Sequence, residues 1–367
     1  MSDKASKPRD AGKATKRDDL NKGLMSEDAS GAKQPLAEDF YRTYTGHESN
    51  ALRLFAAAMR DAGGAGGATQ RRPLIWLAGD SSLDNKFWLK NTKRTPACNG
   101  EERALRFGGG VAELPEDVAH AANTLLAARG LPFGCVNAAI EESTLARRAG
   151  GVLLPQDEVL RDQLADGDII IVSVGGNDIA FQPSLATIMA LLRMLGLPCC
   201  CLPRLGGASD ARLEDGTAPG FAHIAKIFGA DTRDFVRALL SGPQRAQPAL
   251  VIVSMIYHPL EANAGACGGG WADLALSALG YNSNPGRLQI VNRSLFRDAT
   301  SRIDLGAHIK FVACPLFNVL DPHNPAHYVE RVEPSAVGGA LMAREFVRLV
   351  VEHALAATAS AGTDKAQ

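Results

Sequence analysis

One stretch does most to decide the fold: residues 168–178, with the sequence DIIIVSVGGND. Its isoleucines and valines, interrupted only by Ser173, are typical of a strand buried on both faces of a sheet. Two glycines then allow the chain to turn, and the polar pair Asn177-Asp178 follows. The stretch therefore predicts a central strand of a parallel sheet, with polar groups just beyond its carboxyl end.

The rest of the chain repeats this alternation of apolar strands and helices. Further strands are predicted over residues 73–78, 133–138, 249–256 and 308–313. Helices are predicted within residues 39–62 and over 115–129, 160–164, 188–196, 221–240, with a break at Gly229, 288–303 and 337–355. Such an order indicates an α/β fold whose parallel sheet is covered by helices on both faces. Ligands of these sheets bind beyond the carboxyl ends of the strands.

Composition places the chain among ordinary globular proteins. Its 367 residues are 46% hydrophobic and 22% charged, with a formal net charge of -1, so no nucleic-acid partner is expected. The longest apolar run, residues 188–201, is interrupted by Arg193 and Pro198, so no transmembrane segment is expected. The start has no apolar signal-peptide core, and seven cysteines do not form an even disulfide set, so a cytoplasmic location is predicted. The sequence leaves the oligomeric state open.

The domain organisation follows from shifts in composition. Residues 1–35, rich in Lys, Asp, Ser and Ala, are predicted to be a disordered tail. Residues 36–70 read as a helical segment followed by a glycine-rich joint, and 71–357 as the α/β domain. Residues 358–367 are predicted to be a disordered C-terminus.

Three polar clusters follow predicted strands, and the first two each have a structural alternative. The first is GDS, residues 79–81, where Ser81 could expose its hydroxyl at the sheet edge or could cap a helix. The second contains Gly175 and Asn177, whose amide N–H could face a developing oxyanion, or which could form a simple turn. Neither cluster decides between its two interpretations alone.

The third cluster is the loop DPHNPAHY, residues 321–328, after the last strand. A hydrolytic serine needs a base to accept its proton, and that base needs an orienting partner. His323 and His327 are candidate bases in this loop, although most loop histidines are merely solvated.

Taken together and in order, the three clusters resemble the motifs of the SGNH hydrolase family, also called GDSL esterases and lipases, over about residues 74–347. The resemblance implies a flavodoxin-like three-layer α/β/α fold and hydrolysis of a small-molecule ester without a metal or organic cofactor. It implies Ser81 as nucleophile, with its own N–H in the oxyanion hole. It also implies Asn177 as side-chain oxyanion donor and Gly175 as the glycine of the same block.

The sequence departs from the family pattern in two places. Glu142 stands at the position where the family has the oxyanion-hole glycine. A backbone N–H is still present at this position, but the glutamate side chain adds a carboxylate. Asn324 stands where the family has the aspartate three residues before the histidine. The resulting hypothesis has His327 as base and Asp321 as its carboxylate partner, with His323 and His258 as alternatives. A catalytically impaired binding protein, or an acyltransferase that uses the same serine, are the competing functions.

Some segments also resemble a poorly characterised branch of the same superfamily. They are residues 79–88, GDSSLDNKFW, residues 271–285, and the Glu-Pro-Ser motif at 333–335. Phe87 and Trp88 could form a substrate wall, but packing of the first helix on the sheet is the commoner role. Cys199-Cys200-Cys201 lacks the spacing of a zinc site and is interpreted as a cluster of free thiols.

Overall fold

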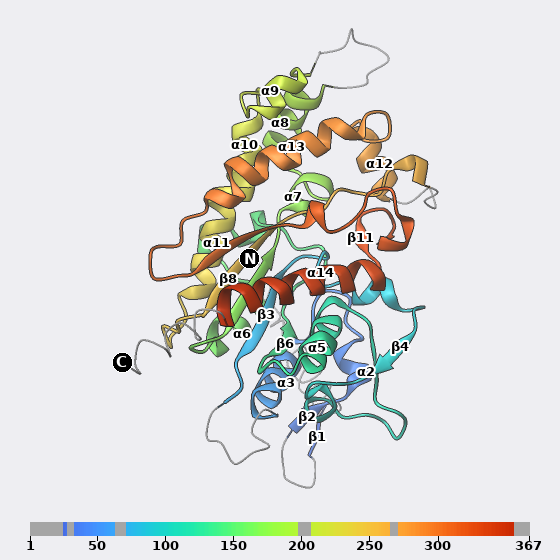
Figure 1. Cartoon of the computed structure of the whole chain (residues 1–367), viewed down its shortest axis with the longest axis vertical. Helices are drawn as coiled ribbons and strands as arrows, with labels where there is room; N and C mark the ends of the chain where they lie inside the picture. Colours follow the sequence, from blue (N-terminus) through green and yellow to red (C-terminus); the bar gives the residue numbers. More distant parts are fainter. Residues whose placement is uncertain (1–24, 28–32, 63–70, 197–206, 265–270, 356–367) are drawn as a thin grey trace, which may run out of the picture.

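The computed structural model describes residues 25–27, 33–62, 71–196, 207–264 and 271–355. Its centre is a five-stranded sheet in which all neighbouring strands are parallel. In spatial order the strands are β6 (Gly134–Asn137), β3 (Leu74–Gly79), β7 (Ile169–Ser173), β8 (Leu250–Met255) and β9 (Phe311–Pro315) (Figure 1). The predicted parallel sheet is therefore confirmed, and each of its strands lies within or beside its predicted range.

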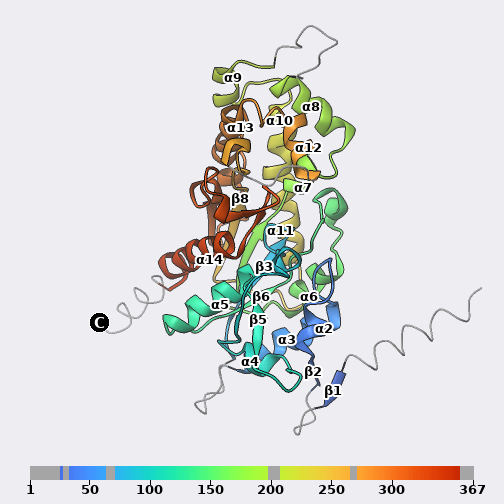
Figure 2. The same ribbon diagram turned by 90° about the vertical axis from the view of Figure 1, so that its right-hand side faces the viewer.

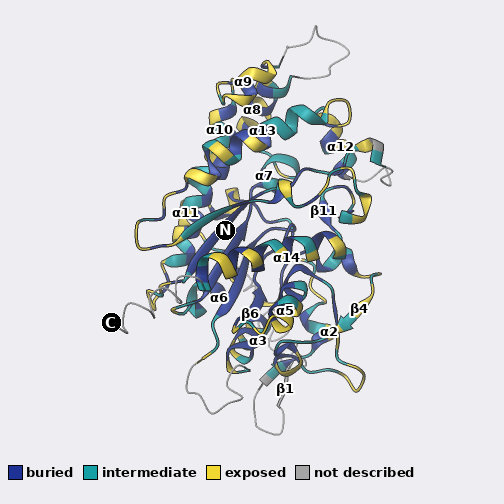
Figure 3. Cartoon of the chain, viewed as in Figure 1, coloured by how far each residue is buried: buried dark blue, intermediate teal, exposed yellow. Residues whose placement is uncertain are grey.

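Helices cover both faces of this sheet, which gives three layers (Figure 2). On one face lie α5 (Val118–Ala128) and α14 (Ala336–Val350), which pack on Ile75 and Leu77 of β3. On the opposite face of the sheet, Trp76 of β3 packs against the second layer of helices. That layer contains α3 (Ser49–Asp61), α6 (Pro155–Gln163), α11 (Thr232–Leu240) and α13 (Pro285–Asp298). Burial on both faces explains why β3, β6, β7 and β8 are mostly apolar, and these four strands are buried at every residue, as the dark blue in Figure 3 shows. The edge strand β9 is mostly half-buried.

A group of helices lies at one end of the molecule, at the top of Figure 1. These are α8 (Leu185–Leu195), α9 (Asp210–Glu214), α10 (Phe221–Lys226) and α12 (Trp271–Ala278), together with part of α13. The short helix α7 (Gly176–Ala180) connects β7 to this group. The group therefore stands beyond the carboxyl end of the central strand.

Small strands and short α-helices lie around this framework, together with short 3-10 helices such as η1 (Lys86–Leu89), which follows the Ser81 turn. The strands and α-helices are β1 (Met25–Glu27), β2 (Lys33–Pro35), α2 (Ala37–Phe40), β4 (Arg94–Pro96), α4 (Glu101–Ala104), β5 (Glu113–Pro115), β10 (Tyr328–Val329) and β11 (Glu333–Pro334). β1 pairs with β2, β4 with β5, and β10 with β11, each antiparallel. Helix α3 contributes Leu52, Phe55 and Met59 to the main core, so this N-terminal helix is packed into the domain.

Several helix bounds differ from the predicted ones: the helix predicted over 160–164 is α6 at Pro155–Gln163, and the one predicted over 288–303 is α13 at Pro285–Asp298. Two further differences have identifiable reasons. The helix predicted from residue 115 begins at Val118, because Pro115 ends β5 and the Asp117 carboxylate accepts the N–H of His120 as the cap. The break predicted at Gly229 is instead a wide π-helical turn, η3 (Ile227–Asp231), between α10 and α11. A Cβ at Gly229 would lie 3.3 Å from that of Ala299, so glycine permits close packing at this turn.

The glycine-rich joint, the Cys199–Cys201 cluster and residues 358–367 lie outside the described residues, as does most of the predicted N-terminal tail. Within the described ranges, no helix has both the length and the apolar character needed to cross a bilayer.

Candidate active site

Ser81 lies in the turn that follows β3, at the carboxyl edge of the sheet. Gly79 makes this position possible, because a Cβ there would lie 1.9 Å from the carbonyl oxygen of Ser173 on β7. The next residue, Asp80, donates its backbone N–H to that same carbonyl at 3.2 Å. The close approach of β3 and β7 therefore fixes where the chain delivers the Ser81 hydroxyl.

The side chain in contact with this hydroxyl is Glu333. Ser81 Oγ donates a hydrogen bond to Glu333 Oε1 at 3.0 Å, and the glutamate is only 3% exposed. The backbone around Glu333 is held on two sides. Asn85 Nδ2 donates to the carbonyl of Pro334 at 3.2 Å, and Ser335 caps α14 by accepting the N–H of Gly338. The glutamate is therefore placed by the start of the last helix and not by a free loop.

Several carboxyl groups are buried close to Ser81, and of these Asp84 forms an ion pair with the buried Lys86. Burial raises the pKa of Glu333 to about 8, and the neighbouring Asp80 and Asp84 carboxylates add to this rise. Burial and the charge of Glu333 together raise the pKa of Glu141 to about 9. One oxygen each of Asp80, Glu141 and Glu333 has no hydrogen-bond partner among the described residues. Glu141 and Glu333 are therefore the two carboxyl groups of this acidic cluster whose pKa values are raised above neutral pH.

Asn177 and Gly175 lie at the next strand end, as the sequence predicts. The Asn177 amide donates one N–H to the carbonyl of Ser143 at 3.0 Å, which leaves its second N–H for another acceptor. Gly175 has φ +100°, and a Cβ there would lie 2.8 Å from the Phe228 ring. The glycine is thus required both by the backbone conformation and by the packing around it.

Glu142 occupies the backbone conformation that favours glycine, with φ +59°. Its carboxylate accepts a hydrogen bond from Tyr44 Oη at 2.9 Å. Neither the backbone N–H of Glu142 nor that of Ser81 has an acceptor within the described part of the chain. Ser81 and Asn177 line a common cavity, and Glu142 is not among its lining residues.

A cavity of about 120 Å³ opens from Ser81 into the group of helices described above. Its polar lining residues include Asp80, Ser81, Ser82, Asn177, His258, Asn292 and Glu333. The remaining wall is mostly apolar and includes Ile179, Leu191, Ile224, Phe228, Leu276 and Val291. This arrangement suits a ligand with a polar reacting group and an apolar tail.

The candidate histidines are placed differently from Glu333. His258 lines the cavity, and burial lowers its pKa to about 4, so its ring is neutral. The ring bonds recorded for His327 stay within its own loop: Nδ1 accepts the N–H of Asp321 at 3.1 Å, and Nε2 lies 3.1 Å from Asn324 Nδ2. His323 Nδ1 lies 3.1 Å from the exposed Asp321 carboxylate. Among the described residues, none of these histidines is hydrogen-bonded to Ser81, and the role of His327 with Asp321 stays a prediction.

Glu333 was not predicted from the sequence as a site residue; it was identified only as part of the Glu-Pro-Ser motif. A signal for it exists, because it stands two residues before the helix-capping Ser335, on the approach to α14. Nothing in the sequence alone shows that this approach reaches Ser81, 252 residues away in the chain.

Comparison with known proteins gives distant structural similarities. No family model and no curated protein sequence matches the chain. Among solved structures, it resembles an extracellular lipase from Streptomyces rimosus (14% identity, TM-score 0.37, covering 74% of this chain and 98% of that one). It also resembles a GDSL-like lipase from Bacteroides thetaiotaomicron (11%, TM-score 0.33, 82% and 98%). A Bacillus subtilis protein matches at 13% and TM-score 0.36 over 77% of this chain, which spans only 56% of that protein.

At such distances these similarities assign no family, no activity and no residue role to this chain. The roles considered for Ser81, Asn177 and Glu333 rest on the chain's own geometry.

Proposed function

We propose that the protein is a serine hydrolase that cleaves esters through an acyl-enzyme on Ser81, with Glu333 as the base. The observation that carries the proposal is the 3.0 Å hydrogen bond from Ser81 Oγ to the buried Glu333 carboxyl, at the wall of an apolar cavity. A nucleophile bonded to a base in a cleft is the arrangement that nucleophilic catalysis requires.

In the proposed first step, ionised Glu333 takes the Ser81 hydroxyl proton as Oγ attacks the ester carbonyl carbon. The Ser81 and Glu142 N–H groups and the Asn177 amide stabilise the tetrahedral oxyanion. Glu333 then returns the proton to the leaving alcohol as the C–O bond breaks, which leaves the acyl group on Ser81. A water molecule repeats the sequence, with Glu333 again as base and then as acid, and releases the carboxylic acid.

Glu141 is assigned a positioning role, because its charge interacts with that of Glu333. Two carboxyl groups in one buried place do not both ionise easily, so together they hold a proton above neutral pH. Trp88 Nε1 donates to Glu141 Oε1 at 3.2 Å, which fixes the glutamate beside the site. Trp88 thereby acts in this proposal through a hydrogen bond and not only through packing.

A second function, a binding protein with impaired turnover, is favoured by one observation. At neutral pH the raised pKa of Glu333 keeps much of this carboxyl protonated, and a protonated base does not activate serine. Acyl transfer to an acceptor other than water uses the same residues and differs only in the second step.

The test measures hydrolysis of p-nitrophenyl esters of increasing chain length at pH 9 by the wild type, Ser81→Ala, Glu333→Gln and His327→Gln. The proposal expects turnover by the wild type, none by Ser81→Ala, and a loss of at least about 100-fold in Glu333→Gln. His327→Gln is expected to keep its activity. If His327→Gln lost activity while Glu333→Gln retained it, His327 and not Glu333 would be the base. No turnover and no labelling of Ser81 by a serine-reactive probe would favour the binding protein.

A further inference from the structure

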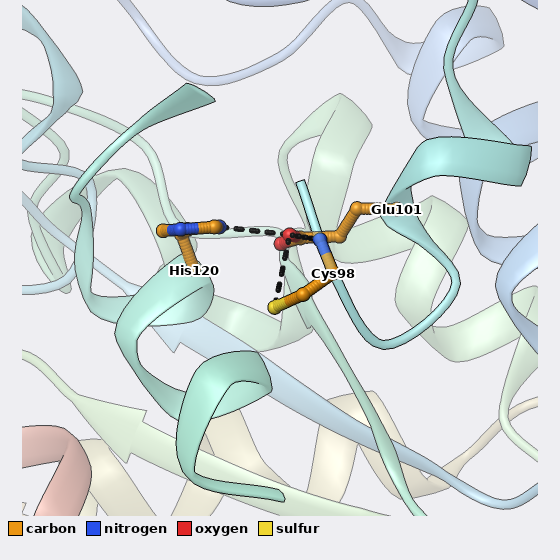
Figure 4. A group of neighbouring side chains, drawn as sticks. All are labelled: Cys98, Glu101 and His120. Carbon is orange, nitrogen blue, oxygen red and sulfur yellow. Dashed lines mark hydrogen bonds and ion pairs between the residues drawn. The ribbon is translucent and has the colours of Figure 1, made fainter. Parts of the chain in front are cut away.

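A second cluster of reactive side chains lies on α4, α5 and the chain just before α4. In the part of the chain that the structure describes, one group of three potential metal ligands converges: Cys98 Sγ, Glu101 Oε2 and His120 Nδ1. These atoms lie within 4.8 Å of one another, and Figure 4 shows the three side chains pointing toward a common centre. None of the three residues lines the Ser81 cavity.

We propose that Cys98, Glu101 and His120 bind a zinc ion. A thiolate, an imidazole and a carboxylate form a mixed ligand set that zinc accepts, and it binds them tetrahedrally at about 2.0–2.3 Å. Water would fill the fourth position, because Cys98 is only half-buried while the other two ligands are buried.

Two distances between ligand atoms can be compared with those of a tetrahedral site, where they measure roughly 3.4–3.8 Å. Cys98 Sγ already lies 3.8 Å from Glu101 Oε2. His120 Nδ1 lies 2.7 Å from the same oxygen, so these two atoms would have to separate by about 0.7 Å as the ion replaces the proton between them. A side-chain torsion change of this size needs no backbone rearrangement.

Outer contacts orient the ligands, as they do in established metal sites. Thr95 Oγ1 lies 2.6 Å from His120 Nε2, which leaves Nδ1 to face the centre. Asn123 Nδ2 donates to Glu101 Oε1 at 2.8 Å. Glu101 Oε2 accepts the backbone N–H of Cys98 at 3.1 Å, and its second lone pair would bind the ion.

The charge around the cluster favours a cation. Glu101 is 1% exposed, and the fully buried Asp117 carboxylate lies at the start of α5, three residues before His120. Asp117 Oδ1 accepts the N–H of His120, but Oδ2 has no partner among the described residues. The Arg72 guanidinium also interacts with the charges of Glu101 and Cys98. Two buried carboxylates and a metal-bound thiolate would therefore stand against one guanidinium and a neutral imidazole, and a dication would offset this excess of negative charge.

The test uses the full-length reduced protein, stripped with a chelator and titrated with Zn²⁺ and, separately, Co²⁺. One equivalent of Zn²⁺ is expected to bind with a dissociation constant below about 1 µM. Co²⁺ is expected to give the near-ultraviolet charge-transfer band of a thiolate ligand. Cys98→Ser should abolish that band, and both Cys98→Ser and His120→Gln should weaken Zn²⁺ binding at least about tenfold.

Controls separate this site from other thiols and from the hydrolase. A Cys199→Ser, Cys200→Ser, Cys201→Ser variant and Ser81→Ala should both bind Zn²⁺ like the wild type. Circular dichroism checks that each variant folds. If His120→Gln does not fold, the test rests on Zn²⁺ binding by Cys98→Ser, which is nearly isosteric and lies at a half-buried position. Absence of a bound equivalent in the wild type would overturn the proposal. So would unchanged binding in Cys98→Ser with loss in the triple variant.

Discussion

At the scale of the residue, the defining feature is a serine whose hydrogen-bond partner is a glutamate. A carboxylate is a weaker base than imidazole when exposed, with a usual pKa near 4.3. Burial raises the pKa of Glu333 to about 8, which brings its basicity into the range that proton transfer from serine requires. The buried environment of Glu333 therefore makes this carboxylate a stronger base than an exposed glutamate.

This pKa predicts the pH dependence of the reaction. Because only ionised Glu333 can accept the Ser81 proton, kcat/KM is expected to rise with pH and to level off above about pH 8. A stopped-flow or plate assay with p-nitrophenyl acetate over pH 5–10 measures this profile, after subtraction of the rate of Ser81→Ala. A profile that instead levels off near pH 6.5 would indicate a solvated histidine base.

Replacing the base with the more usual one provides a matched variant. Glu333→His is expected to retain part of the activity, within about 100-fold of the wild type, and to move the rise in kcat/KM toward neutral pH. Glu333→Gln, of the same size as glutamate but unable to take a proton, is the control. Equal activity of Glu333→His and Glu333→Gln would show that this position does not act as a base.

At the scale of the element, the start of α14 holds the base in place. Ser335 accepts the N–H of Gly338 at 3.1 Å and donates its own hydroxyl to the carbonyl of Ala326, so it connects the helix start to the preceding loop. Glu333 lies two residues before this cap, on β11. The position of the base is therefore coupled to the stability of the helix start.

Ser335→Ala is expected to lower the free energy of unfolding by about 1 kcal/mol, because the cap is lost. It should also lower kcat/KM by about tenfold, since Glu333 would be less firmly held. Urea unfolding and ester hydrolysis measure the two effects. Glu48→Ala, which removes the cap of α3, is the control: it should cost similar stability and leave kcat/KM unchanged. An equal fall in activity in both variants would mean that Ser335 acts only through global stability.

Elements were more predictable than the site. Strands β3, β7 and β8 were predictable because continuous apolar runs have few alternatives to a buried strand. Gly79, Ser81, Gly175 and Asn177 were predictable in place because they follow those strands directly. Glu333 was not, because its approach to Ser81 depends on how the segment from β9 to α14 folds back. That segment's β10 and β11 are two residues each, too short to leave a periodic signal.

At the scale of the whole molecule, the acidic cluster costs stability at high pH. A carboxyl group whose pKa is raised on folding binds more protons in the folded than in the unfolded state between the two pKa values. Stability from such a group is therefore full below about pH 4.5, and it is lost as pH rises through the folded pKa of about 8. Raised pKa values at Glu141 and Asp80 act in the same direction.

Glu333→Gln is accordingly expected to be more stable than the wild type at pH 9, by on the order of 3 kcal/mol, and similar to it at pH 5. Urea unfolding followed by circular dichroism at both pH values measures the difference. Asp304→Asn, at a site where no such cluster is present, is the control and should change stability little at either pH. A wild type that is more stable than Glu333→Gln at pH 9 would mean that the carboxylate is stabilised by folding.

The central claim, that Glu333 activates Ser81, is tested most directly by the rate at which a fluorophosphonate probe labels Ser81. Mass spectrometry of the peptide that contains residue 81 measures this rate from pH 6 to 10 in the wild type, Glu333→Gln and His327→Gln, with Ser81→Ala as the blank. We predict that labelling of the wild type accelerates up to about pH 8, that His327→Gln behaves the same, and that Glu333→Gln is labelled at least about 100-fold more slowly. Labelling of Glu333→Gln at the wild-type rate would contradict the account.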